Sequence, residues 1–363
     1  MAEQAAINKQ DTPSPKVGSP KSPGKSPSRS PQAAAGPAAV DAVDDGDFDS
    51  AILDVDTFSS TASVSSSILQ YRTIKGRTYH SERHNSDYYA PNDERQNDSV
   101  DITHHYLTLL LGGKLYLAPI AKNIQRVLDV GTGTGIWAID FADDHPSASI
   151  TGTDLSPTQP TWVPPNVRFE VDDATAPSWT WDDNAFDFIH MRYLFGAIAD
   201  WPQLFANAFR VCAPGGWVQS GEVEVDFVSD DGSVKADSAL ALWGRMCRET
   251  GEKIGRTFRV LSEGVQKRGM EGAGFVDLES VDYQLPVGGW PADKKLAEVG
   301  QFVRLTLEND LEGYSTFMWN QVLNWGADEY QMFLMRTRKE LKDPSIHSYF
   351  RVRYVYGRKP ATA

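Results

Sequence analysis

The amino-acid sequence predicts an α/β fold built on a mostly parallel sheet. From about residue 100 onward, short apolar segments typical of strands alternate with helical segments, and a glycine-rich turn follows the first of these strands. Such alternation favours parallel strands that are covered by helices on both faces. The C-terminal part differs, because two strand-like segments there are separated by a long helical stretch.

The expected elements can be placed in chain order. Strands are expected at residues 125–130, 148–152, 167–171, 185–191, 217–227, 275–285 and 349–356. Helices are expected at 135–142 and near 203–212, and Pro214, Gly215 and Gly216 form a turn before the fifth strand. Residues 286–348 have a helical pattern. Antiparallel pairing of the last two strands would then complete the sheet.

The composition limits the class of protein. The chain has 363 residues, two cysteines (Cys212 and Cys247) and a formal net charge of −14. Two cysteines cannot build a disulfide scaffold and fit a reducing compartment. No N-terminal apolar core typical of a secretory signal is present, and the most apolar stretch, residues 107–121, is too short to span a bilayer. We therefore expect an intracellular protein that does not insert into membranes.

The N-terminal part has the composition of a disordered segment. Residues 12–39 are rich in Pro, Ser and Lys, and residues 41–56 contain seven aspartates and no basic residue. Such segments bury too little apolar surface to fold, so we expect residues 1–66 to be disordered and residues 67–363 to form one domain. The Ser-Pro motifs at Ser14, Ser22 and Ser26 suit proline-directed kinases, although a merely solvating segment is the alternative.

Charge also bears on the partners. Because most of the negative charge lies in the expected folded domain, that domain would repel a phosphate backbone. Direct binding of nucleic acid by the folded domain is therefore not expected.

The strongest local signal is the segment VLDVGTGTGIWAIDFA at 127–142. A strand containing Asp129 runs into a turn with Gly131, Gly133 and Gly135, where the backbone can approach a ligand closely. The spacing is G-x-G-x-G rather than the G-x-G-x-x-G of dinucleotide-binding proteins. It resembles the first motif of class I S-adenosylmethionine (AdoMet)-dependent methyltransferases, in which Thr132 would also line the cofactor site. A purely structural turn is the alternative.

Acidic residues follow at the ends of the next two strands. Asp154, followed by Leu155, ends the second strand, where a carboxylate can accept hydrogen bonds from both hydroxyls of a ribose. Asp172, Asp173 and Ala174 end the third strand. There the methyltransferase superfamily places an acidic side chain against the adenine amino group, and we choose Asp173 with Asp172 as the alternative. Each aspartate could separately be a loop cap.

A narrower resemblance covers residues 68–360. The matching segments are GRTYH (76–80), YAPND (89–93), GGKLYLAPI (112–120), LDVGTGTGIWAIDFAD (128–143), GTDLSPTQPTWVPPNVRFEVDDA (152–174), FDFIHMR (186–192), PGGW (214–217), SDDGS (229–233), LNWGADE (323–329) and YVYGRKP (354–360). With these segments the chain resembles the LaeA-like fungal methyltransferases, which include regulators that associate with velvet-domain proteins. The resemblance implies a seven-stranded Rossmann-like sheet with an antiparallel last strand, a helical insertion before that strand, AdoMet as cofactor, velvet-domain partners, and a location in nucleus and cytoplasm.

Candidate residues for chemistry lie at the end of the fourth strand and before the domain core. His190 is placed to accept a proton from a hydroxyl acceptor, although His190 and Arg192 could instead hydrogen-bond loops at the rim. Tyr79 and His80 lie where the family has a segment that folds over the cofactor, with packing onto the sheet as the competing account. The histidines lack the spacing and the cysteine partners of a metal site, so no metal is expected.

These observations predict an AdoMet-dependent methyltransferase. The leading interpretation is a nuclear regulator of development and secondary metabolism. The alternatives are an O-methyltransferase for a small metabolite and a non-catalytic AdoMet-binding adaptor. A nicotinamide oxidoreductase is disfavoured by the missing third glycine of its fingerprint.

Overall fold

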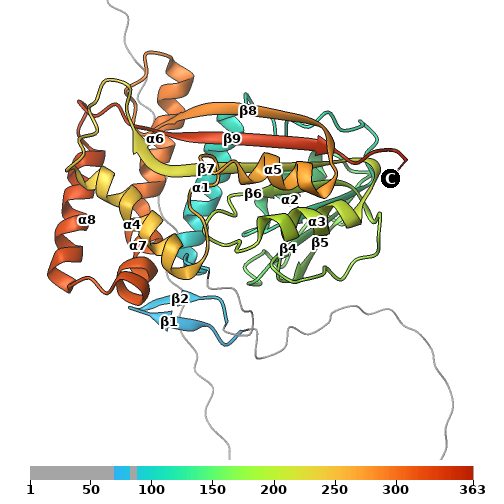
Figure 1. Cartoon of the computed structure of the whole chain (residues 1–363), viewed down its shortest axis with the longest axis horizontal. Helices are drawn as coiled ribbons and strands as arrows, with labels where there is room; N and C mark the ends of the chain where they lie inside the picture. Colours follow the sequence, from blue (N-terminus) through green and yellow to red (C-terminus); the bar gives the residue numbers. More distant parts are fainter. Residues whose placement is uncertain (1–68, 82–87, 363) are drawn as a thin grey trace, which may run out of the picture. The chain divides into compact units, whose positions relative to one another are not determined.

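A seven-stranded sheet lies at the centre of the computed structural model, which describes residues 69–81 and 88–362 (Figure 1). Its strand order is β5-β4-β3-β6-β7-β9-β8. The strands are β3 (Arg126–Val130), β4 (Ser149–Asp154), β5 (Val167–Val171), β6 (Phe186–Arg192), β7 (Cys212–Val228), β8 (Val276–Pro286) and β9 (Tyr349–Arg358). β9 pairs antiparallel with both of its neighbours, whereas β3 to β7 pair in parallel. The expected seven-stranded, mostly parallel sheet with an antiparallel last strand is confirmed.

The described residues fall within the unit Ala62–Ala363. The expectations for residues 1–66, including disorder and the Ser-Pro motifs, lie outside the described residues. The segment 82–87 also lies outside the described residues, so the expectation that the histidines form no metal site is not addressed for His84.

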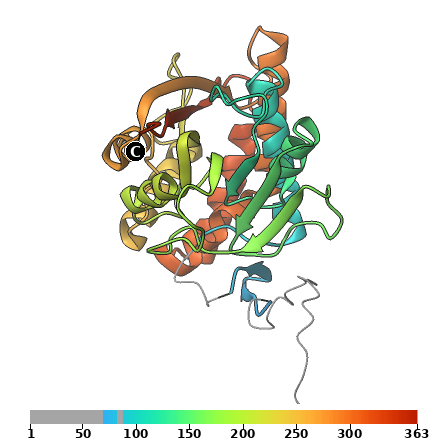
Figure 2. The same cartoon turned by 90° about the vertical axis from the view of Figure 1, so that its right-hand side faces the viewer.

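Helices cover both faces of the sheet, as Figure 2 shows. The crossover helices are α2 (Ile136–Asp144), α3 (Trp201–Val211) and α5 (Val265–Ala273). Val127 and Leu128 are neighbours on β3, so their side chains point to opposite faces. Val127 shares an apolar core with Phe141 of α2, and Leu128 shares another with Phe205 of α3 and Met270 of α5. The parallel strands are apolar on both faces because both are buried.

Side-chain caps set where several helices begin. The side chains of Asp93, Asp200, Ser238 and Asp293 each accept a hydrogen bond from the backbone N–H three residues further on. These residues precede α1 (Glu94–Leu110), α3, α4 (Ala239–Ile254) and α6 (Lys294–Asn309), respectively. Each cap satisfies a backbone donor that the first helical turn leaves unpaired.

A helical layer packs on the extended ends of β7 and β9. It comprises α4, α6, α7 (Leu311–Phe317), a π-helical turn η1 (Met318–Leu323) and α8 (Ala327–Leu341). Its apolar core includes Val223 and Val225 of β7 together with Phe350 and Val352 of β9. The expected insertion at 286–348 is therefore present. It does not stand alone, because α4 comes from the connection between β7 and β8 and joins it.

A short hairpin attaches the segment before the core to this helical layer. The hairpin consists of β1 (Arg72–Ile74) and β2 (Arg77–Tyr79), paired antiparallel. Arg77 forms ion pairs with Asp93, which caps α1, and with Asp310, which caps α7, and its hydrogen bonds to Asp310 are 2.7 Å long. The hairpin thereby links α1 to the helical layer.

The Pro-Gly-Gly segment differs from the expectation. It was expected to be a turn before a strand, but β7 already begins at Cys212 and the segment lies inside it. The register between β6 and β7 shifts between Phe186 and Phe188, and Gly215 has a φ of +79°. The three residues thus form an irregularity within the strand, where glycine accommodates the left-handed backbone.

Candidate functional site

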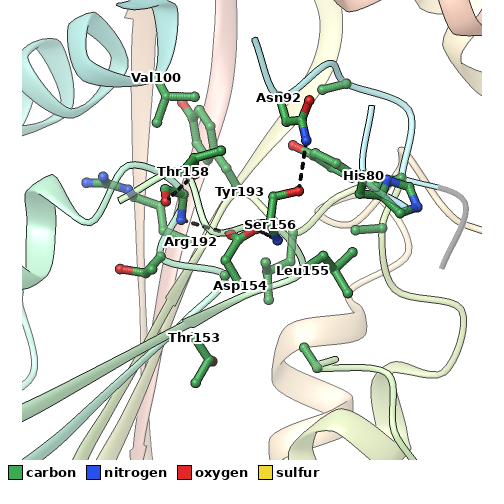
Figure 3. A pocket seen from close by; sticks show the side chains of 18 of the residues that line it. His80, Asn92, Val100, Thr153, Asp154, Leu155, Ser156, Thr158, Arg192 and Tyr193 are labelled. Atoms are coloured by element: carbon green, nitrogen blue, oxygen red, sulfur yellow. Dashed lines mark hydrogen bonds between the residues drawn. The ribbon is translucent and has the colours of Figure 1, made fainter. Parts of the chain in front are cut away.

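A cavity lies at the carboxyl ends of β3, β4, β5 and β6, and Figure 3 shows part of its lining. Open α/β sheets bind ligands at this edge. The predicted cofactor residues that line it are Asp129, Gly131, Thr132, Gly133, Asp154, Leu155, Asp172, Asp173 and Ala174. His80, His190 and Arg192, which were predicted for the lid and the chemistry, line the same cavity. The fold therefore brings these predicted residues from five separate segments to one place.

The glycine loop is held from both sides by hydrogen bonds. The backbone N–H of Gly133 donates to Oδ2 of Asp154 at 2.9 Å. The carbonyl of Gly133 accepts from the Thr158 hydroxyl at 2.9 Å and from Nε2 of Gln159 at 2.6 Å. Thr158 and Gln159 belong to the DLSPTQP segment, which thus orients the glycine loop.

This loop fits the cofactor that the sequence predicts. Gly133 has a φ of +59°, and a Cβ there would lie 3.4 Å from Val100 of α1 across the cavity. Without a side chain, the backbone itself lines the cavity and leaves room for a ligand. Burial raises the pKa of Asp154, and hydrogen bonds from the amides of Gly133 and Ser156 oppose this shift. The half-buried carboxylate remains suited to accept hydrogen bonds from ribose hydroxyls.

Asp172 and Asp173 lie at the end of β5, and both remain candidates for the contact with the adenine amino group. Oδ1 of Asp173 accepts hydrogen bonds from the backbone N–H and the hydroxyl of Thr175, at 2.8 and 2.7 Å. Oδ1 of Asp172 accepts from the backbone N–H of Asp173 at 2.8 Å. Both side chains line the cavity and both shape the turn.

Two predicted residues, Gly135 and Tyr79, are not among the described residues that line the cavity. Gly135 caps α2 with a φ of +82°, and a Cβ there would lie 2.3 Å from the ring of Phe169. Glycine is required at this position for packing. Tyr79 is fully buried and packs against Phe317 of α7 with ring centroids 6.4 Å apart. Tyr79 thus packs against α7 of the helical layer, and its ring contact is not with the sheet.

His190 belongs to a buried stack beneath the glycine loop. Its ring lies 3.8 Å from the Trp137 ring and parallel to it, and its Nδ1 donates to Asp129 at 2.7 Å. Asp129 also accepts from the Thr132 hydroxyl at 2.6 Å. Burial lowers the pKa of His190 although Asp129 raises it, so the ring is neutral at pH 7. Nε2 then carries a lone pair, and none of the described residues forms a hydrogen bond with it.

Arg192 and His104 connect three elements beside the cavity. Nη2 of Arg192 lies 3.3 Å from Nδ1 of His104, whose Nε2 donates to Asp140 of α2 at 2.9 Å. Burial, followed by the Arg192 charge, lowers the pKa of His104 to about 4. His104 is therefore a neutral connector between α1, β6 and α2. Across residues 69–81 and 88–362, no three His, Cys, Asp or Glu side chains are grouped so that they could hold a metal ion.

Several lining residues were not among the sequence predictions. Among them are Tyr88, Tyr89, Ala90, Pro91, Asn92, Gln96, Asn97, Val100, Thr103, Tyr193, Leu194, Phe195 and Tyr314. The side-chain amide of Asn92 donates to the Ser156 hydroxyl at 3.1 Å, as Figure 3 shows. The YAPND segment was visible in the sequence as part of the resemblance, which was the only available signal for its role.

Comparison with known proteins assigns the family. A family model described as a methyltransferase domain matches residues 102–280. Methyltransferase pytC of Aspergillus terreus is 38% identical over 307 residues, which is 84% of this chain and 93% of that protein. Secondary metabolism regulator LAE1 of Cochliobolus heterostrophus is 31% identical and covers 78% of this chain and 94% of its own length. Protein-methionine methyltransferase laeA of Emericella nidulans is 30% identical, with coverages of 80% and 77%.

Solved structures with similar folds include phosphoethanolamine N-methyltransferase 2 of Haemonchus contortus in complex with AdoMet. It has 18% identity and a TM-score of 0.41, and the match covers 73% of this chain and 52% of that one. The sequence relationships, at 30% identity or more over most of each relative, carry the assignment. The chain belongs to the LaeA-like family of AdoMet-dependent methyltransferases.

Proposed function

We propose that the chain binds AdoMet in the cavity at the carboxyl ends of β3 to β6 and transfers its methyl group to an acceptor in secondary metabolism. The observation that carries this proposal is the convergence of Gly133, Asp154 and the Asp172–Asp173 pair on one cavity. Relatives named as regulators of secondary metabolism support the biological setting.

Each group in the cavity has a binding task. Asp154 accepts the ribose hydroxyls, the end of β5 receives the adenine amino group, and the glycine loop lies against the amino-acid part of the cofactor. Bound AdoMet supplies an already activated methyl group. The protein therefore has mainly to align the acceptor with it, which is worth several kcal/mol when the alignment is good. His190 and Arg192 lie at the end of β6, where the acceptor approaches.

Isothermal titration with AdoMet, S-adenosylhomocysteine and NAD tests the cofactor. We expect AdoMet and S-adenosylhomocysteine to bind and NAD not to bind. Binding of NAD alone would overturn the proposal.

The regulatory version of this function places the protein in nucleus and cytoplasm, bound to velvet-domain proteins. It is supported by the relatives named as regulators, by the Ser-Pro motifs, and by a negative charge suited to a basic docking surface. A pull-down from nuclear and cytosolic extracts tests it. Velvet-domain proteins in the nuclear fraction are the expected result, and cytosolic recovery with biosynthetic enzymes would contradict it.

A second candidate is methylation of a small metabolite. It is favoured by the 38% identity to methyltransferase pytC over nearly the whole of that protein. A non-catalytic adaptor would bind AdoMet but would not convert it to S-adenosylhomocysteine when a cell extract is added. Formation of S-adenosylhomocysteine therefore distinguishes the regulatory methyltransferase and the small-metabolite methyltransferase from the adaptor.

A further inference from the structure

A second cavity adjoins the cavity that contains the predicted cofactor site. The two share five lining residues, namely Tyr89, Thr103, Tyr193, Phe195 and Tyr314. The second cavity lies between the extended strands β7 to β9 and the helical layer. Its further lining residues are Tyr106, Val223, Val225, Trp243, Cys247, Phe258, Leu285, Val303, Thr306, Leu307, Met318 and Phe350. Among residues 69–81 and 88–362, seventeen line this cavity, and none of these is charged at neutral pH.

We propose that this cavity, here called the acceptor cavity, holds the methyl acceptor and selects a neutral single-ring or similarly small apolar body with a hydroxyl group. This inference rests on the proposed function, because it assumes that the adjoining cavity holds AdoMet. It identifies the substrate class of that site.

The distribution of polar groups gives the acceptor an orientation. Four of the five shared residues carry a hydroxyl group, whereas most of the others are aliphatic or aromatic. The hydroxyls of Thr103 and Thr306 donate to the carbonyls of Ser99 and Phe302, so these side chains add little polarity. The apolar body would lie among Val223, Val303 and their neighbours, with its hydroxyl toward the junction.

The tyrosines at the junction are neutral. Burial raises the pKa of Tyr89, Tyr193 and Tyr314 above the ordinary value of a phenol. A carboxylate or ammonium group in this cavity would be desolvated without a charged partner, which is strongly unfavourable. The cavity therefore disfavours acceptors such as a lysine side chain or a carboxylic acid.

The wall between the two cavities is anchored to the sheet. The backbone amides of Leu194 and Phe195 donate to the two oxygens of Glu222 on β7, each at 3.1 Å. The amide of Tyr193, which has a φ of +58°, donates to the carbonyl of Gly221 at 2.9 Å. Because the buried carboxyl group of Glu222 and the carbonyl of Gly221 hold three successive backbone amides, the junction is a built feature of the fold.

The volume limits the size of the acceptor. The acceptor cavity has a volume of about 90 Å³, compared with about 190 Å³ for the cavity that contains the predicted cofactor site. An apolar cavity of about 150 Å³ holds benzene, so a single ring enters only with a small adjustment of the lining. Met318 is the most adaptable lining side chain and is the natural place for that adjustment.

The transfer itself balances without another reactant. The acceptor oxygen forms a bond to the methyl carbon, the bond between that carbon and sulfur breaks, and its electron pair stays on sulfur. The cofactor becomes the neutral thioether S-adenosylhomocysteine, and the hydroxyl proton is released to water.

Ligand-observed NMR on the full chain saturated with S-adenosylhomocysteine tests the proposal with four probes: phenol, 4-hydroxybenzoate, N-acetyl-lysine methylamide and N-acetyl-methionine methylamide. We expect phenol to bind at least tenfold more tightly than the other three. Equal or tighter binding of the charged probes would overturn the proposal. Preference for the methionine probe would also overturn it, in favour of a protein acceptor.

Variants of α6 and η1 locate the binding. Val303→Phe fills the acceptor cavity and should weaken phenol binding at least tenfold while the affinity for S-adenosylhomocysteine changes less than twofold. Leu305→Phe adds the same ring to the exposed face of α6 and should leave both unchanged. Met318→Ala enlarges the cavity and should extend binding to 1-naphthol. If Val303→Phe unfolds, Val223→Ile takes its place with a smaller loss.

These outcomes separate the two proposals. If the wild-type chain does not bind S-adenosylhomocysteine, the proposed function fails. If it does, but phenol binding is absent or insensitive to both filling variants, only the acceptor proposal fails.

Discussion

Gly133 shows most directly how a single backbone position determines cofactor binding. Gly133 has a left-handed φ. Its backbone N–H donates a hydrogen bond to Asp154, and its carbonyl accepts two more, so the backbone cannot change conformation to accommodate a branched side chain. Gly133→Val should abolish AdoMet binding, measured by titration, in a chain that remains folded by circular dichroism. Gly232→Val is the matched control, because Gly232 has a φ of +68° with nothing near its Cβ position. Unchanged AdoMet affinity in a folded Gly133→Val chain would refute the site assignment.

Asp154 should contribute more to cofactor affinity than either aspartate at the end of β5. Asp154→Ala removes the carboxylate that would accept hydrogen bonds from both ribose hydroxyls and that accepts one from the Gly133 amide. We therefore expect a loss of about 1.5–3 kcal/mol in the free energy of AdoMet binding. Asp173→Ala should cost less, because one bond to the adenine amino group is lost. Titration with AdoMet gives both values. A silent Asp173→Ala together with a damaging Asp172→Ala would move the adenine contact to Asp172.

His104 makes stability depend on pH. Its pKa is about 4 in the folded chain, because of burial and then Arg192, against about 6.5 when unfolded. The unfolded state therefore binds more protons between these values, and the free energy of unfolding falls as the pH drops from 6.5 toward 4. His104→Gln should reduce the difference in urea unfolding between pH 7.5 and pH 5. An unaltered difference would show that His104 does not contribute to it.

At the scale of elements, the β1–β2 hairpin should stabilise the helical layer through one arginine. Asp310 is completely buried, and Arg77, with 14% of its side chain exposed, is its main partner. Arg77→Ala leaves that charge without this partner and should lower the free energy of unfolding by about 3–5 kcal/mol. Arg358→Ala breaks the more exposed pair with Asp277 and should cost about 1 kcal/mol or less. Equal losses in urea denaturation would contradict the role of the hairpin.

The elements that the sequence predicted well are those with a strong local pattern. The strand at 167–171 has the predicted bounds, and the other strands begin or end within a few residues of expectation except β7, which starts five residues early. Proline and two glycines suggested a turn there, but Cys212 already pairs with Phe186 of β6, and Gly215 and Gly216 exchange backbone hydrogen bonds with Lys359. Likewise, nothing local to residues 239–254 indicates that α4 joins a helical layer whose other members follow it by forty residues or more.

At the scale of the whole molecule, the cofactor site was predictable because its residues follow strands at fixed positions. The acceptor cavity was not, because Tyr106, Val303 and Phe350 come from α1, α6 and β9 and meet only in the folded chain. Their aromatic and aliphatic character was equally consistent with an ordinary core. The role of Thr158 and Gln159 had a signal in the DLSPTQP segment, but a motif alone does not say which backbone group its side chains contact.

The division of the chain yields the last prediction. The described residues that line the two cavities lie between positions 80 and 350, so we expect a chain that begins at residue 67 to bind AdoMet with an affinity within twofold of the full chain. If residues 1–66 serve regulation, their removal should instead reduce recovery of velvet-domain proteins in a pull-down, because a segment outside the domain can be bound or phosphorylated without altering the cavities. Titration and pull-down on the same two proteins separate these effects. Loss of AdoMet binding on truncation would show that the N-terminal residues belong to the cofactor site.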